Sequence, residues 1–299
     1  MNDIIIKNGR VIDPASGRDE VCDVAIKDGF VAKVGKAGKG GKKTEVIDAS
    51  GQIVCPGLID LHVHCREPGH EEEETIATAA AAAVAGGFTT ICAMPNTHPP
   101  QDDEATILYV LQRAARAGLA RVLPVGCLTK GRKGEELAEM GMMLQAGAVA
   151  FSDDGEGVGS TSVTQRAMQY TRMLGTVLMQ HCQDPDLFTG VMNSGPVAVR
   201  LGLGGIASAG EEIMLRRDLS PVERTGPPYP DTHVSTAGRV RIIAQARAAG
   251  LPLTAAATPH HQRPSEPHRI SSDTNHNLKP HRLSATTANN MLRTQTPCG

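Results

Sequence analysis

The sequence has 299 residues, with 30 basic and 32 acidic side chains and a formal net charge of −2 at pH 7. This balanced charge gives no field that would gather nucleic acid or an anionic membrane surface, so we expect a small-molecule substrate. No stretch has the roughly 20 apolar residues of a membrane span, and seven cysteines without CxxC spacing indicate reduced thiols in a cytoplasmic protein.

The first 55 residues read as a small unit of short β-strands. Apolar runs of strand length alternate with turn signals at Asn8-Gly9 and Asp28-Gly29 and with a Gly/Lys-rich loop. The sequence therefore predicts a small β-sandwich portion over 1–55, with hairpin turns between strands at 4–7, 24–27, 31–34 and 45–47.

From residue 56 to 261, apolar β runs alternate with Ala-rich segments of helical length. This alternation predicts βα units and a parallel sheet. The first helix is expected to carry Glu71 to Glu74 in its first turn and to stop at Gly86-Gly87. Seven strands are expected, at 58–63, 88–94, 121–125, 148–152, 176–180, 232–235 and 253–257.

Two further segments depart from this pattern. Residues 184–230 form a long excursion, with a helix expected around 211–217 and a Pro-rich loop before residue 231. Residues 262–299 are rich in Pro, His, Ser, Thr and Asn with almost no apolar periodicity, so we expect a divergent, poorly ordered tail.

The most informative motif is Asp-Leu-His-Val-His-Cys-Arg-Glu-Pro-Gly at 60–69, at the end of an apolar strand. Strand alternation predicts that His62, His64 and Arg66 share one face, and two imidazoles at this spacing suit one metal ion. The guanidinium of Arg66 suits a carboxylate ligand. The ordinary alternatives are hydrogen-bonded histidines and a surface ion pair between Arg66 and one of Glu71 to Glu74.

The run PGLIDLHVHCREPG resembles the signature of the dihydroorotases, within the amidohydrolase superfamily. The resemblance implies a TIM-type (β/α)8 barrel of the metal-dependent hydrolase kind. It also implies that Asn96, in Met-Pro-Asn-Thr at 94–97, helps Arg66 to hold the substrate carboxylate. Without the resemblance, Pro-Asn-Thr would be interpreted as a turn.

The resemblance extends to the later strand ends. It implies that Asp154, in Ser-Asp-Asp-Gly at 152–155, bridges two zinc ions, whereas Asp153 marks a turn. It also implies that His181 and His233 are ligands of the second zinc. The run 148–155 has no lysine, which favours the aspartate-bridged subtype over hydantoinases with a carboxylated lysine.

The implied function is reversible, zinc-dependent hydrolysis of L-dihydroorotate to N-carbamoyl-L-aspartate in de novo pyrimidine biosynthesis. The family's Asp-His-Ala-Pro-His motif, whose aspartate serves as general acid and base, does not occur in the sequence, so no catalytic residue is identified.

Seven strands do not close an eight-stranded barrel, so we expect an incomplete barrel, a truncated chain and doubtful activity. Two alternatives remain open. One is a non-catalytic subunit that partners aspartate carbamoyltransferase. The other is a cyclic amidohydrolase of hydantoinase or allantoinase type. A homo-oligomer is also compatible with the sequence.

Overall fold

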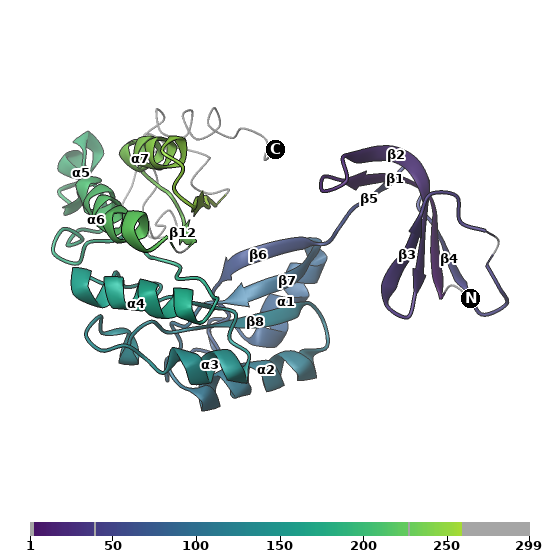
Figure 1. Cartoon of the computed structure of the whole chain (residues 1–299), viewed down its shortest axis with the longest axis horizontal. Coiled ribbons are helices and arrows are strands. Elements are labelled where there is room, and N and C mark those ends of the chain that lie inside the picture. The colour runs from purple at the N-terminus through teal and green to yellow at the C-terminus, as the bar shows by residue number, and fades with distance from the viewer. Residues whose placement is uncertain (1–2, 39, 227, 259–299) are drawn as a thin grey trace. The chain divides into compact units, whose positions relative to one another are not determined.

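The computed structural model describes residues 3–38, 40–226 and 228–258. The chain divides into two compact units, Met1–Leu58 and a second unit that begins at Ile59 (Figure 1). Within the described residues, no helix is both long and apolar enough to cross a membrane. The expected tail at 262–299 lies outside the described residues.

The first unit is a five-stranded sheet in the order β3-β2-β1-β4, with β5 also paired to β1. β1 and β2 are antiparallel, as are β2 and β3, while β4 and β5 run parallel to β1. Its buried apolar core is small, because it consists of Ile5, Ala25 and Ala37. The strands are β1 (Ile4–Asp13), β2 (Arg18–Lys27), β3 (Phe30–Val34), β4 (Glu45–Asp48) and β5 (Ile53–Val54).

Asn8-Gly9 is not the turn that the sequence predicted, because both residues lie inside the ten-residue strand β1. Between Ile6 and Gly9 the register with β2 shifts, which makes this position a β-bulge. Asn8 takes the left-handed conformation at φ 62°. A Cβ on Gly9 would lie 2.5 Å from Cγ2 of Val54, so this close approach requires glycine.

From Leu58 onward the chain alternates strands with helices, as expected for βα units (Figure 1). Residues 184–230, expected as one excursion with a Pro-rich loop, contain two helices and two short strands, and Pro230 lies in a third strand. The elements are β6 (Leu58–Val63), α1 (Ile76–Ala85), β7 (Phe88–Ala93), α2 (Glu104–Ala117), β8 (Arg121–Gly126), η1 (Lys130–Arg132), α3 (Met140–Ala146), β9 (Ala150–Phe151), α4 (Thr161–Met173), β10 (Met192–Asn193), α5 (Pro196–Leu201), β11 (Gly205–Ile206), α6 (Ala209–Thr225), β12 (Tyr229–Asp231), α7 (Ala237–Ala248) and β13 (Leu253–Ala255).

The strands follow one another across the sheet in chain order. β6, β7, β8 and β9 are neighbours, and β12 pairs in parallel with β13. Between β9 and β12, the predicted strand at 176–180 forms only single parallel bridges, Phe151 with Leu178 and Gln180 with Asp231. It is not a full strand, because β9 has only two residues and β12 only three.

The strand expected at 232–235 ends earlier, at Asp231. At Thr232 polar groups turn to other partners, although the N–H of Val234 still donates to the carbonyl of Ala256 just after β13. The Thr232 hydroxyl donates to the carbonyl of Gln180, and the Thr232 carbonyl accepts from Arg239. The segment at 232–235 is therefore a loop between β12 and α7.

The helix boundaries follow from capping. α1 begins after Thr75, whose hydroxyl accepts from the backbone N–H of Thr78. Glu71 to Glu74 therefore precede the helix and do not lie in its first turn, contrary to the sequence prediction. α2 begins after Asp103 and ends at Gly118 in the left-handed conformation.

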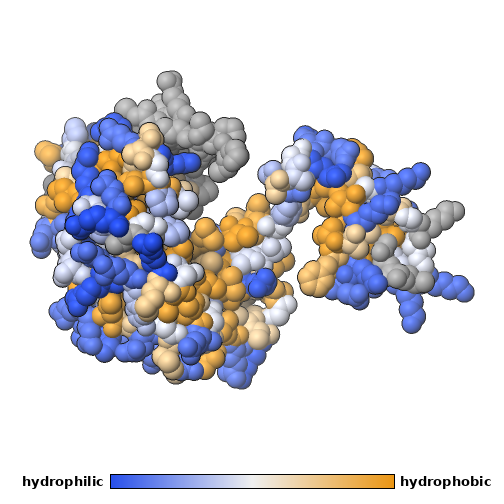
Figure 2. Space-filling model, viewed as in Figure 1, coloured by the Kyte–Doolittle hydropathy of each residue, from blue (hydrophilic) through white to orange (hydrophobic). Residues whose placement is uncertain are grey.

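The main apolar core of the second unit lies between the sheet and the helices that follow its strands, with Phe151, Met143 and Met168 fully buried. Among the described strands, β6 has β7 as its one neighbour in the sheet, and its Leu58, Ile59 and Leu61 are each about half exposed. Figure 2 shows apolar surface over this part of the sheet. The parallel pairs β7–β8 and β8–β9 bring their carboxyl ends to one rim of the sheet.

Candidate metal centre

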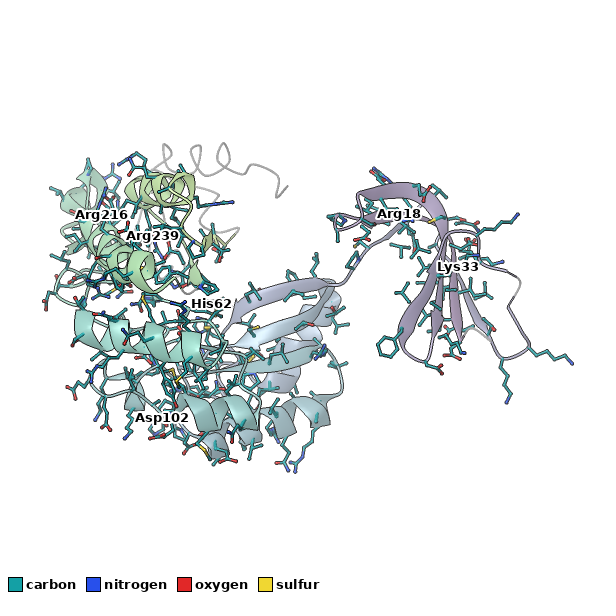
Figure 3. All side chains as sticks on the ribbon, in the orientation of Figure 1. Arg18, Lys33, His62, Asp102, Arg216 and Arg239 are labelled. Carbon is teal, nitrogen blue, oxygen red and sulfur yellow. The ribbon has the colours of Figure 1, made fainter. Side chains whose placement is uncertain are left out.

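The five side chains that sequence analysis proposed as metal ligands lie together at the rim of the second unit. Each one sits at, or a few residues after, the carboxyl end of a strand or bridge. His62 is labelled at the end of β6 in Figure 3. The others are His64 just after β6, Asp154 after β9, His181 after the bridge residue Gln180, and His233 after β12.

Asp154 lies at the centre of this cluster, and its two carboxylate oxygens divide the four histidines into two pairs. Oδ2 lies 3.3 Å from Nε2 of His62 and 3.5 Å from Nε2 of His64. Oδ1 lies 3.0 Å from Nδ1 of His181 and 3.3 Å from Nε2 of His233. Each oxygen of one buried carboxylate therefore faces two imidazoles.

In two of the histidines, the ring nitrogen that does not face Asp154 is hydrogen-bonded to a side-chain amide. Nδ1 of His64 donates to Oδ1 of Asn96 at 2.9 Å, and Nε2 of His181 donates to Oε1 of Gln183 at 2.6 Å. These bonds fix the tautomers, because the remaining nitrogen of each neutral ring carries a lone pair. That lone pair faces a carboxylate oxygen of Asp154.

The electrostatics of the cluster favour neutral His64 and His233 beside an ionised carboxylate. Burial alone would raise the pKa of Asp154, but the contacts of its carboxylate with the imidazoles of His181, His233 and His62 hold it well below its usual value. Burial lowers the pKa of His233 well below the usual histidine value. Burial also lowers the pKa of His64. These are the protonation states that metal ligands require.

Three observations support the fit of these ligand atoms to metal ions. Ligand atoms of His62, Asp154 and His233 all lie within 4.8 Å of one another. The distances of 3.0–3.5 Å from histidine nitrogens to Asp154 oxygens also match two ligands of one zinc ion. Atoms about 2.0–2.1 Å from zinc at a tetrahedral angle lie roughly 3.3 Å apart. In addition, lone pairs on His181 and Asp154 repel at 3.0 Å unless a cation lies beside both.

The alternation argument does not extend to Arg66, because β6 ends at Val63 and Arg66 is left-handed at φ 60°. Its Nε lies 3.1 Å from Oε2 of Glu73, the ion pair that the sequence allowed as an alternative. Arg66 still lies close enough for its charge to contribute to lowering the pKa of His64. Its substrate role stays a prediction.

Asp153 and Asp154 are adjacent but have different surroundings. The carbonyl of Asp153 accepts from the backbone N–H of Glu156, so the expected turn is present. Its carboxylate, which sequence analysis left without a role, is buried and accepts from the N–H groups of Leu128 and Thr129 and from the Thr129 hydroxyl. Asp153 therefore anchors the loop after β8.

The two cysteines beside the site are buried thiols. Burial raises the pKa of Cys65 to about 12 and raises that of Cys182 well above its usual value. Both thiols therefore stay protonated near neutral pH in the metal-free protein.

Sequence analysis missed the contacts that orient the ligands. Gln183 could have been suspected from its position two residues after His181. The contact of Asn96 with His64 spans 32 residues and leaves no local signal.

Comparisons with known proteins agree with the geometry. Residues 51–238 match the profile of a family described as dihydro-orotase-like. Dihydroorotase from Anaeromyxobacter sp. (strain K) is 52% identical over 263 residues, which cover 87% of this chain and 61% of the relative. Dihydroorotase from Pelotomaculum thermopropionicum is 47% identical over 259 residues, 86% of this chain and 60% of the relative. The chain thus spans about three fifths of the length of these relatives.

Solved structures show the fold. L-Hydantoinase from Arthrobacter aurescens superposes with a TM-score of 0.77 at 23% identity, over 97% of this chain and 66% of that chain. D-Hydantoinase from Thermus sp. gives a TM-score of 0.74 at 20% identity, with the same coverage. The expected incomplete TIM-type barrel is confirmed, because these neighbours are barrel amidohydrolases and the sheet here is an open part of one.

Proposed function

Since this chain belongs to the dihydro-orotase-like family, we propose that it is a cyclic amide hydrolase of the dihydroorotase type. Its reaction would be the reversible hydrolysis of L-dihydroorotate to N-carbamoyl-L-aspartate. The proposal places this reaction in de novo pyrimidine biosynthesis in the cytoplasm. The six cysteines among the described residues are all free, which agrees with a reducing compartment.

One observation carries the proposal: the carboxylate of Asp154 faces two histidines with each of its oxygens. A carboxylate in this position suits a bridge between two cations, each of which would take two imidazoles. We therefore propose two zinc ions per chain, held by His62, His64, Asp154, His181 and His233. The identity of the metal is part of the proposal.

When bound, zinc lowers the pKa of a ligand water to roughly 7 and polarises an amide carbonyl. The residues of the chain prepare the site for that chemistry. Asn96 and Gln183 hold His64 and His181 in the tautomers that leave a lone pair toward Asp154. Burial keeps His233 neutral, so this imidazole needs no proton loss before it can act as a ligand.

Substrate anchoring is assigned to Arg66 and Asn96. The Oδ1 atom of Asn96 is used by His64, so its NH2 group is left to donate to a substrate carboxylate. Gly155 lies beside this amide, since a Cβ at that position would lie 3.6 Å from Nδ2 of Asn96. Arg66 would exchange its exposed ion pair with Glu73 for the substrate carboxylate.

Proton transfer is not assigned to any residue, because the sequence lacks the aspartate motif that the family resemblance assigns to it. The test of the proposal therefore measures binding as well as turnover. Zinc per chain is determined by metal analysis after dialysis against free zinc. Binding of N-carbamoyl-L-aspartate to the zinc-loaded chain is measured by calorimetry, with hydantoin and dihydrouracil as competitors.

We expect about two zinc ions per chain and binding of N-carbamoyl-L-aspartate that depends on zinc. Product formation is followed by chromatography in both directions as the readout of the proposed hydrolysis. A protein that stays free of zinc would contradict the proposal. Preferential binding of hydantoin would instead favour a hydantoinase-type substrate.

A further inference from the structure

A fully buried arginine lies beside the metal centre and takes no part in ligand binding. Arg239 of α7, labelled in Figure 3, has 0% exposure. Its guanidinium donates to both carboxylate oxygens of Asp231, with Nε 2.9 Å from Oδ2, and to the carbonyl of Thr232 at 2.8 Å. A third branch reaches Glu211 of α6 at 3.2 Å. A charged side chain is rarely this buried unless it is fully paired.

This cluster holds the chain on both sides of His233. Arg239 contacts Asp231 and Thr232 before the histidine. Glu211 accepts from the hydroxyl of Ser235 after it. Asp231 is also in bridge register with Gln180, the residue before His181. The segment 231–235 is therefore fixed at both ends and aligned with the other histidine of its pair.

His233 needs such support because its backbone is strained. Its φ is 38°, a conformation that is unfavourable for non-glycine residues and that they keep only where the surroundings impose it. Its Nδ1 has no hydrogen-bond partner within the described part of the chain. Its Nε2 faces Oδ1 of Asp154 at 3.3 Å, and its ring centroid lies 4.5 Å from that of His181.

We propose that Arg239 and Glu211 act as positioning residues that clamp the segment 231–235 and so present Nε2 of His233 to Asp154. The inference rests on the proposed function, because His233 needs to be positioned only if it binds a metal ion. The contacts described above support the position itself. Buried ion pairs add little net stability compared with packed apolar residues, so the clamp is better explained by the conformation it imposes.

The experiment uses the full chain with four variants. Arg239→Met removes the clamp but leaves the charge of Asp231 buried. The double variant Asp231→Leu/Arg239→Met removes the clamp together with the buried charge of Asp231, and it leaves Glu211 bonded to the hydroxyl of Ser235. Ser235→Ala weakens the clamp from the Glu211 side with little risk to folding. Arg241→Met is the matched control, because Arg241 is exposed on the same helix.

Two quantities are measured. Zinc affinity is determined by competition with a chromophoric chelator. Backbone hydrogen exchange of the metal-free proteins is followed for peptides that contain 231–235, with peptides from β7 and β8 as the internal reference. Far-UV circular dichroism reports whether each variant is folded.

We expect the double variant to bind the zinc ion of the His181–His233 pair about 10- to 100-fold less tightly, the range typical of lost ligand support. Its segment 231–235 should exchange faster while β7 and β8 stay protected. Ser235→Ala should change both readouts in the same direction by a smaller factor, and Arg241→Met should change neither.

A double variant with wild-type zinc affinity and wild-type exchange at 231–235 would show that the arginine only neutralises Asp231, and would overturn the clamp. If the wild-type chain binds no zinc, the proposed metal site is wrong, and the clamp is then tested by hydrogen exchange at 231–235 alone. If the Arg239 variants do not fold, the same two measurements on Ser235→Ala test the clamp.

Discussion

The amide oxygen of Asn96 lies 2.9 Å from Nδ1 of His64, although 32 residues separate them in the chain. The bond leaves Nε2 of His64 to face Asp154 and leaves the NH2 group of Asn96 free to donate. One side chain thus contacts a proposed metal ligand and offers a donor to the proposed substrate. The two roles can be separated by substitution.

Asn96→Asp should keep zinc affinity and lose substrate binding. The aspartate retains an oxygen that accepts from His64, but its charge repels the carboxylate of N-carbamoyl-L-aspartate. Asn96→Ala should lose both, with zinc affinity falling about tenfold because His64 is no longer oriented. Chelator competition measures the first quantity and calorimetry the second. Equal zinc affinities for the two variants would contradict the orienting role.

Asp154→Asn should lower the zinc content of the purified chain from about two ions to one or none. The amide keeps the shape of the side chain but removes the charge that faces all four histidines. Asp153→Asn is the matched control, because that carboxylate bonds the loop after β8. Metal analysis after dialysis gives the answer. Full zinc occupancy in Asp154→Asn would refute the bridging assignment.

Acid should destabilise the metal-free protein through His233. Burial lowers the pKa of this group well below 6.5, so below that pH the unfolded chain binds a proton that the folded chain excludes. The free energy of unfolding therefore falls as pH decreases below 6.5, by up to about 1.4 kcal/mol per pH unit for one histidine.

The check compares the wild-type chain with His233→Asn in urea titrations between pH 7 and about pH 5. The contribution of Asp154 is lost only below its usual value of 3.8, outside this window. The variant should show the shallower pH dependence. Parallel curves for the two proteins would mean that His233 titrates alike in both states.

Arg113→Met should destabilise the second unit without changing zinc content. Arg113 pairs with Glu67, which is only 2% exposed and also accepts from the N–H of Ile76, the first residue of α1. Removing the partner of a buried charge costs about 3–5 kcal/mol, but Arg113 is more than a third exposed, so we expect about 1–2 kcal/mol.

Urea unfolding measures the change in stability. Arg116→Met, an exposed position on the same helix, is the control and should stay within about 0.5 kcal/mol of wild type. If both variants unfold at the wild-type midpoint, Arg113 contributes nothing to the burial of Glu67.

The sequence predicted the parts of the fold that depend on local patterns. Alternating apolar runs located β6, β7 and β8 to within a residue or two, and α1 ends at Gly86 as the Gly86-Gly87 pair predicted. It was wrong where tertiary contacts outweigh local preference. Asn8-Gly9 became a bulge because β2 continues to pair beyond it.

The amino-acid sequence shows which chemical groups follow the strands, because strand alternation and the dihydroorotase resemblance are both read from consecutive residues. How these groups meet depends on the fold. The carboxylate of Asp154 faces histidines that follow different strands, and the buried Arg239 of α7 is paired with residues of β12 and α6. Such contacts depend on packing and on the cost of burying unpaired charge, which no local pattern records.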